Sequence, residues 1–243
     1  MKAYLERSLL AGIFAIGLVG FAWPLWIPAT ANTDLSGWMA LALMPLILIA
    51  ALSLNQGPIA GPRKLAMLAV LSALAAATRI ATSGVGGFEL IFAIVILGAA
   101  ALGARFGFLL GASSVLLSSL FFGGIGPWTA FQMFAVGWVG FGAGALGAQL
   151  ALRKPLVLAA YGFFASYVFG LIMNLWFWPF AVGPTTSISY QPDAGLSQNL
   201  VSFLTYTLLS STLTWDTLRA ISTAAVILLV GKPVLLTLNR YRF

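Results

Sequence analysis

Long apolar runs alternate with short polar or glycine-rich breaks along the whole chain, and this pattern predicts membrane-spanning helices. A helix needs about 20 apolar residues to cross roughly 30 Å of hydrocarbon. Runs near that length are predicted at residues 8–27, 38–54, 64–83, 88–103, 106–122, 128–150, 156–180 and 216–237. The predicted fold class is an all-α integral membrane protein of about eight transmembrane helices.

One apolar stretch, at residues 200–213, is too short for a span of its own. About 14 apolar residues reach only partway across a bilayer. We interpret this stretch as a helix that lies at the outer surface or dips partway into the membrane.

The basic residues fall mostly on one side of the membrane when the N-terminus is placed in the cytoplasm. The cytoplasmic ones are Lys2, Arg7, Arg63, Lys64, Arg105, Arg153, Lys154, Lys232, Arg240 and Arg242. Only Arg79 and Arg219 fall on the outer side. This asymmetry follows the positive-inside rule. It predicts a multi-pass protein of the cell membrane with both termini in the cytoplasm.

The first span has a second interpretation as a cleaved signal peptide. Lys2 and Arg7, the apolar run and Ala29-Thr30-Ala31 match its general pattern. The run is longer than the usual h-region of about 7 to 15 residues, however, and it contains Pro24 and two tryptophans. A retained helix is favoured, and the remaining spans keep the same orientation in both cases.

Composition removes several function classes. Hydrophobic residues make up 61% of the chain and charged residues 7%, and there is no cysteine or histidine. Zinc sites and Ser-His or Cys-His catalysis are therefore excluded. Gly231-Lys232 is followed by Pro233, so no P-loop is present either. The net charge of +7 is explained by topology and contact with anionic lipids, and nucleic acid is not expected as a partner.

Most of the acidic and tryptophan residues gather at the predicted outer side. They are Asp34, Glu89, Asp193, Asp216, Trp23, Trp26, Trp38, Trp128, Trp176, Trp178 and Trp215. An aromatic belt normally marks both membrane interfaces. The alternatives are a belt that is heavier on one side and an aromatic-lined cavity open to the outside.

Two amide residues each share a helix face with a tryptophan at this outer depth. Trp128 and Gln132 are four residues apart, as are Asn174 and Trp178. Flat apolar walls with a few polar groups are typical of small-molecule sites. Buried amides also bond neighbouring helices in membranes, so a structural role is the alternative.

The outer charges form two expected pairs. Arg79 ends one span and Glu89 begins the next, and ionisable groups at membrane depth are costly unless paired or solvated. We expect an Arg79–Glu89 bridge or a ligand that both residues share. Asp216 and Arg219 form an i, i+3 pair in the first turn of the last span, where a structural role is favoured.

Small residues form a stripe on the span at 64–83. Ala69, Ala73 and Ala77 recur every four residues, so another helix can pack closely there. A second small-residue helix runs through residues 137–147 and offers the same opportunity.

Three motifs occur at residues 123–133 (GGIGPWTAFQM), residues 174–180 (NLWFWPF) and residues 215–220 (WDTLRA). In this order and spacing they resemble the substrate-binding S components of energy-coupling factor (ECF) transporters. The likeness is greatest to an actinobacterial-type group with two extra N-terminal helices. The resemblance implies two such helices at residues 1–58 and a six-helix S-component core at residues 59–243.

The resemblance also implies a mechanism and partners. Such subunits capture a vitamin from outside and work with a transmembrane coupling subunit and two cytoplasmic ATPases. In the family an AxxxA motif on the first core helix docks on the coupling subunit, and Ala69 and Ala73 match it. The subunit is then expected to topple in the membrane so that its pocket faces inward.

The substrate-binding residues expected from these arguments lie at the outer side. They are Trp128, Gln132, Asn174, Trp176, Trp178, Arg79, Glu89 and Asp216. Cobalamin or another corrinoid is the favoured cargo, with riboflavin, thiamine or a precursor as alternatives. The absence of histidine argues against the cobalt and nickel branch of such systems, and no cofactor is expected.

Three other functions are weighed against this one. A structural or assembly subunit would use the outer tryptophans only as a belt, and a gradient-driven carrier would need no ATPase. An intramembrane enzyme is disfavoured because Ser113 and Ser114 have no histidine or convincing lysine base nearby.

Overall fold

The computed structural model describes residues 12, 14–25, 61–83, 86–149, 155–183, 186–191 and 193–241. Every regular element among them is a helix. After the short η1 (Trp23–Leu25) they are α3 (Pro62–Ala81), α4 (Ile91–Leu102), α5 (Ala104–Phe121), α6 (Pro127–Gln149), α7 (Pro155–Ala181), α8 (Leu196–Thr207), η2 (Leu208–Asp216) and α9 (Thr217–Asn239). The all-α prediction is confirmed for this part of the chain.

Among the described residues, five helical segments are long and apolar enough to cross a membrane. They are Pro62–Ala81, Ala104–Phe121, Pro127–Gly147, Pro155–Ala181 and the continuous run Leu196–Asn239. The predicted second span, the two ends of the first and the possible cleavage site lie outside the described residues. The chain is therefore a multi-pass membrane protein, and of the predicted spans these five segments account for those at 64–83, 106–122, 128–150, 156–180 and 216–237.

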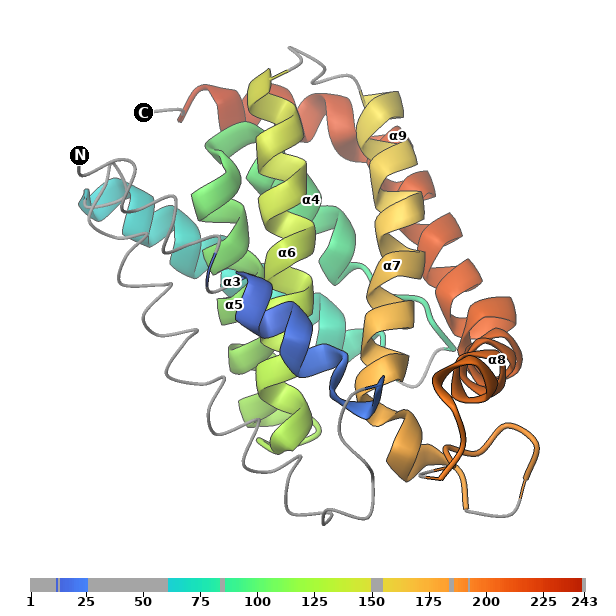
Figure 1. Ribbon diagram of the computed structural model, residues 1–243. Helices are drawn as coiled ribbons and strands as arrows, with labels where there is room; N and C mark the ends of the chain where they lie inside the picture. The colour runs from blue at the N-terminus through green and yellow to red at the C-terminus, as the bar shows by residue number, and fades with distance from the viewer. Residues whose placement is uncertain are drawn as a thin grey trace.

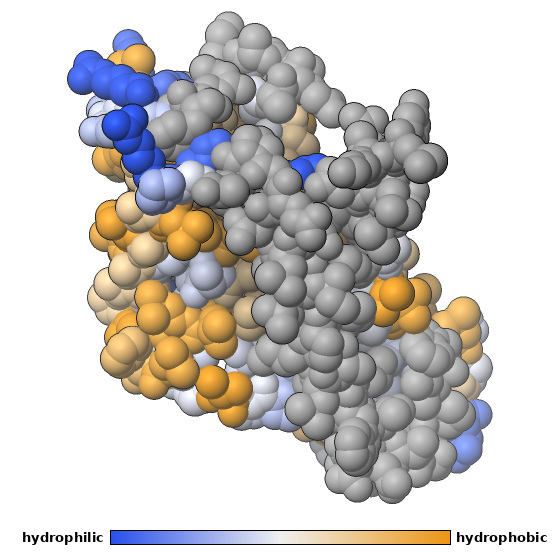
Figure 2. Space-filling model, turned by 90° about the vertical axis from the view of Figure 1, so that its left-hand side faces the viewer, coloured by the Kyte–Doolittle hydropathy of each residue, from blue (hydrophilic) through white to orange (hydrophobic). Residues whose placement is uncertain are grey.

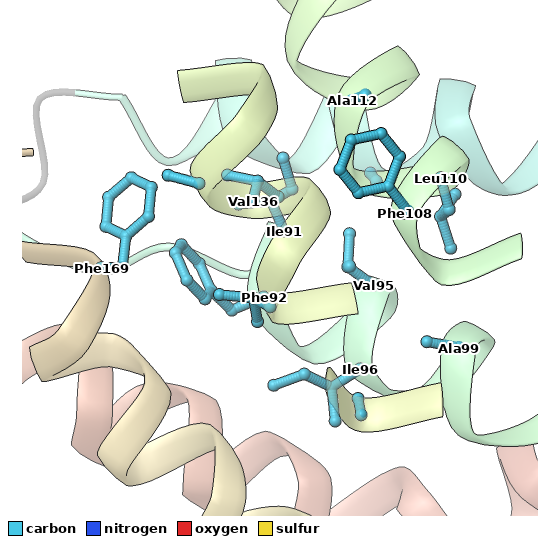
Figure 3. Close-up of a cluster of buried hydrophobic side chains, with 14 of the residues drawn as sticks. Ile91, Phe92, Val95, Ile96, Ala99, Phe108, Leu110, Ala112, Val136 and Phe169 are labelled. Atoms are coloured by element: carbon cyan, nitrogen blue, oxygen red, sulfur yellow. The ribbon is translucent and has the colours of Figure 1, made fainter. Parts of the chain in front are cut away.

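The span expected at residues 88–103 is shorter than predicted. It forms α4, a helix of 12 residues, and at 1.5 Å per residue this is about 18 Å long, too short to cross the hydrocarbon. Nearly all of its side chains are buried. Figure 3 shows why: Ile91, Phe92 and Val95 point into a core shared with α5, α6 and α7.

Helices α5 and α6 pack backbone against backbone. A Cβ atom added at Gly140 would overlap the carbonyl of Gly107, and one at Gly111 would lie 2.5 Å from the carbonyl oxygen of Val136. Close approach through small residues lets membrane helices gain dispersion energy without large side chains. The small residues predicted at 137–147 therefore allow α6 to pack closely against α5 inside the protein.

Two ends of the molecule can be distinguished in Figure 1. At the upper end α3 begins, and α9 turns over the bundle past Pro233 in its interior. At the lower end, which we call the distal end, α3 and α5 finish, α6 begins, and α7 finishes close to α8.

Charge follows these two ends. The basic residues Arg63 and Lys64 open α3, and Arg240 follows α9. On the face drawn in Figure 2, hydrophilic residues gather at the upper end and apolar residues cover the band beneath them. A protein held in a bilayer has this arrangement, with charged residues near the interface and apolar residues against the hydrocarbon.

The last long helical run contains a π-helix. η2 joins α8 to α9 and spans residues Leu208–Asp216. Its side chains bond across five residues: Ser211 donates to Asp216 at 3.0 Å, and the Thr217 hydroxyl donates to the carbonyl of Thr212 at 2.6 Å. π-turns are rare and occur mostly at functional sites. The short helix expected at residues 200–213 is therefore present, and it continues directly into α9.

Candidate functional site at the distal end

The distal end carries two buried or half-buried arginines in different surroundings. We call them the Arg79 cluster, made of Arg79, Ser118 and Gln132, and the Arg219 cluster, made of Glu89, Asp216, Arg219 and Ser211. The first lies between α3, α5 and α6, and the second between η2, α9 and the segment before α4.

In the Arg79 cluster the guanidinium bonds only to neutral oxygens. It donates to the Ser118 hydroxyl and to the Gln132 amide oxygen, each at 2.8 Å. Ser118 in turn donates to the carbonyl of Val115 at 2.9 Å. Within the described residues Arg79 forms no ion pair. The cluster therefore orients a cation without neutralising it.

In the Arg219 cluster the guanidinium lies between two carboxylates. It bonds to Asp216 at 2.7 Å and to Glu89 at 3.1 Å. Asp216 is 1% exposed and Arg219 is 6% exposed. Charge-assisted bonds of this kind offset the cost of burying the ions. Two carboxylates and one guanidinium give this cluster a formal charge of −1.

The surroundings of Arg219 are built closely around these ions. The rings of Phe169 and Phe92 lie 4.9 and 5.5 Å from its guanidinium carbon, within cation–π range. Gly170 leaves the space that the Asp216 carboxylate occupies, since a Cβ there would overlap it. Gly87, at φ 85°, likewise lies against the backbone of Trp215. The absence of side chains at these glycines makes the cluster possible.

One expected pair is confirmed and the other is replaced. Asp216 and Arg219 form the predicted i, i+3 bridge. The Arg79–Glu89 bridge is not formed, because Glu89 pairs with Arg219 instead. Both arginines lie at the same end, and the one that already contacts Asp216 also takes the second acid. Whether Arg79 and Glu89 share a ligand stays a prediction.

Trp128 and Gln132 lie on one face at the start of α6, as predicted. Trp128 is 41% exposed, and its ring lies over Gly126. One turn further along, Gln132 faces Arg79. These two residues therefore combine an accessible indole with the Arg79 cluster.

Asn174 forms a hydrogen bond that links α7 to α8. Its amide nitrogen donates to the Thr207 hydroxyl at the end of α8. α8 exposes Leu200, Val201 and Leu204, while its buried face carries Asn199, Ser202, Phe203, Tyr206 and Thr207. The exposed face also carries Ser197, Gln198 and Thr205, so both faces of α8 mix polar and apolar residues.

Trp176 and Trp178 are buried in the protein core. Trp176 packs on Phe131 at 4.5 Å between ring centroids, and its carbonyl accepts a bond from Trp23. Trp178 is 0% exposed, and its indole N–H donates to the carbonyl of Ile188 at 2.8 Å. Both tryptophans belong to α7, and their burial holds this helix against its neighbours. Their role in substrate binding stays a prediction that would require this packing to open.

The alanine stripe of α3 is on the surface. Ala66, Ala69, Ala73 and Ala77 are all exposed, whereas the neighbouring Ser72, Ala75 and Ala76 are buried. No other described part of the chain covers the stripe. The prediction of partner docking at Ala69 and Ala73 is compatible with this exposure.

Several distal-end residues were not anticipated from the sequence. Ser118 and Thr207 are hydrogen-bond partners of predicted site residues, and Ser211 bonds to Asp216. The buried polar face of α8 has a sequence signal, because Asn199, Ser202, Tyr206 and Thr207 recur at helical spacing. The serine partners have no such signal.

No group of three or more metal-ligating side chains occurs in the described part of the chain. An open hollow of about 260 Å³ lies at the opposite end, lined by Pro233, Val234, Thr237 and Leu238. It is mostly apolar and carries no ionisable group. No family model, curated protein or solved structure matches the chain.

Proposed function

We propose that this protein is the membrane-embedded substrate-binding subunit of an ECF-type importer. It would capture a vitamin, with cobalamin or another corrinoid favoured, and deliver it with a coupling subunit and two ATPases. ATP hydrolysis is assigned to those partners and not to this chain.

The observation that carries this proposal is the concentration of polar groups at the distal end of an otherwise apolar bundle. Arg79, Gln132, Asn174 and the Arg219 cluster come from separate helices and converge there. Polar groups at membrane depth are costly, so such a gathering favours function. The exposed Ala69 and Ala73 add a surface suited to a close helix partner.

A structural subunit is the second candidate, and the burial of Trp176 and Trp178 favours it. Two of the aromatic residues assigned to a cavity pack in the core. If the other distal-end residues also serve packing alone, removing their side chains would affect stability and no ligand.

The first experiment is mass spectrometry of small molecules released from the gently purified full-length protein. The proposal expects a vitamin or corrinoid in near-stoichiometric amount, followed by saturable quenching of tryptophan fluorescence on titration. Asn174→Ala is the better binding variant, because Trp178→Ala would remove a fully buried side chain at a cost of about 3–5 kcal/mol. No released molecule and no response to a vitamin panel would favour the structural subunit.

Partner docking is tested separately by affinity capture of the tagged chain from its native membrane. Wild type should retain a coupling membrane protein and two ATPases, and Ala69→Trp should lose them. Leu229→Trp is the matched control, since Leu229 is 78% exposed on α9. Equal capture by both variants would remove the docking assignment. Uptake by vesicles that hold this chain alone would instead identify a gradient-driven carrier.

A further inference from the structure

The two distal-end arginines differ in what remains for a ligand to bind. A guanidinium has five N–H donors and no acceptor. Arg219 is held by two carboxylates, whereas Arg79 uses its bonds on Ser118 and Gln132 only. The positive charge of Arg79 thus lacks a directly bonded counter-charge in the described part of the chain.

The orientation of Gln132 adds further donors. Arg79 can only donate, so the oxygen of the Gln132 amide must face it. The amide nitrogen therefore points elsewhere, and it makes no hydrogen bond within the described residues. Apart from the second lone pair of the Gln132 oxygen, the hydrogen-bonding groups left open on Arg79 and Gln132 are consequently N–H donors.

Glu89 is the carboxylate that attracts Arg79 through space. Its Oε1 is nevertheless bonded to Arg219 at 3.1 Å. Glu89 therefore offsets part of the charge of Arg79 without occupying its donors. A cation at membrane depth that is left in this state favours a bound anion.

We propose that Arg79 and Gln132 bind an anionic oxygen group, a carboxylate or a phosphate. Guanidinium matches both groups in charge and geometry, with two parallel N–H···O bonds. Trp128 lies one turn from Gln132 and offers an accessible ring. The inference rests on the proposed function and, in place of the corrinoid favoured there, indicates a smaller substrate with a flat ring and an acidic group. A lipid phosphate has the same chemistry and is the second source.

The test uses the full-length protein in nanodiscs of phosphatidylcholine alone, with two pairs of probes. Nicotinate is compared with nicotinamide, and riboflavin 5′-phosphate with riboflavin, by equilibrium dialysis. In at least one pair the anionic member should bind about tenfold or more tightly than its neutral twin, the equivalent of about 1.4 kcal/mol. Arg79→Gln should reduce this preference to less than about twofold. Arg63→Gln, an exposed arginine at the opposite end, should retain it.

The second arm adds phosphatidylglycerol to the nanodiscs and measures retained lipid by native mass spectrometry. Retention that is lost in Arg79→Gln, with no preference among the soluble probes, assigns the anion site to a lipid phosphate. Soluble-probe preference that depends on Arg79 assigns it to the substrate. If neither measurement depends on Arg79, the anion site is wrong.

The outcomes separate this inference from the proposed function. A neutral molecule that is imported with ATPase partners overturns the anion site and leaves the importer. Arg79-dependent anion binding by a chain that recruits no ATPase supports the anion site and contradicts the importer.

Discussion

The Arg79 and Arg219 clusters use the same side chain at the same end of the molecule for different purposes. Arg219 is surrounded by two carboxylates, two aromatic rings and a glycine that makes room for Asp216. Arg79 is oriented by a hydroxyl and an amide, and its remaining donors bond to no other group among the described residues. Each guanidinium thus makes two side-chain hydrogen bonds, and the buried Nε–H of Arg219 has no partner in the described part of the chain. The two arginines differ in charge and burial: Arg219 is buried with two counter-charges and supports the fold, whereas Arg79 is half-buried without a bonded counter-charge and is available to a ligand. Stability measurements on matched variants test this distinction.

The largest effect is expected for Arg219→Gln. It leaves Asp216 and Glu89 without their cation, and breaking a buried ion pair from one side costs about 3–5 kcal/mol. The free energy of unfolding, or the thermal midpoint in detergent, measures the loss. Arg63→Gln is the control and should change it by less than about 0.5 kcal/mol. Equal behaviour of the two variants would show that the Arg219 cluster does not stabilise the fold.

The next effect is expected for Gly170→Ala. The added methyl group would overlap the Asp216 carboxylate, and overpacking of this kind costs about 1–3 kcal/mol. The midpoint of thermal unfolding reports it. Gly183→Ala is the matched control, because a Cβ there meets nothing within 4 Å. A neutral result for Gly170→Ala would mean that Asp216 can move away from Arg219 at little cost.

A smaller effect is expected for Glu89→Gln. The Glu89 side chain is 30% exposed, against 1% for Asp216, so water already screens part of its attraction to Arg219. The loss should be about 1 kcal/mol or less. Asp216→Asn, measured in parallel, should cost more, in the range of about 1.5–3 kcal/mol for a buried charge-assisted bond. A reversed order would place the main counter-charge of Arg219 on Glu89.

The smallest effect on stability is expected for Arg79→Gln. Its hydrogen bonds are to two neutral groups. Ser118 is fully buried, but its hydroxyl keeps its bond to the carbonyl of Val115, so the loss should be about 1 kcal/mol or less. Unfolding should therefore change little while anion binding is lost. A destabilisation comparable to that of Arg219→Gln would assign Arg79 a structural role.

The sequence predicted the helices well because their signals are local. Apolar runs bounded by glycine and proline locate α3, α5, α6, α7 and α9 to within a few residues. The Asp216–Arg219 bridge was also predictable, since residues three apart on a helix are neighbours. The length of α4 could not be predicted, because a buried helix and a membrane-spanning helix have the same apolar composition.

The candidate site was harder to predict because its partners are distant in sequence. Glu89 and Arg219 are 130 positions apart, and Arg79 and Gln132 are 53 apart. Arg79 and Glu89 end and begin successive spans, so the sequence predicted that they pair with each other. In the folded protein Glu89 pairs with Arg219 instead. Composition likewise placed Trp178 at the outer side without distinguishing a cavity wall from a packed core position.

The π-helix η2 has a consequence for insertions and deletions. Its bonds close over five residues, whereas an α-helix closes over four, so η2 holds one residue more than an α-helical connection would need. Deleting Leu213, which is exposed, should let the run become α-helical and leave Ser211 four residues before Asp216, still on the same helix face. A deletion at Gly195, before α8, alters no part of η2 and should be absorbed by the preceding loop. The extra residue of η2 therefore makes this segment a place where the chain can lose one residue without changing which side chains face Arg219, and such a deletion should be tolerated both before this segment and within it.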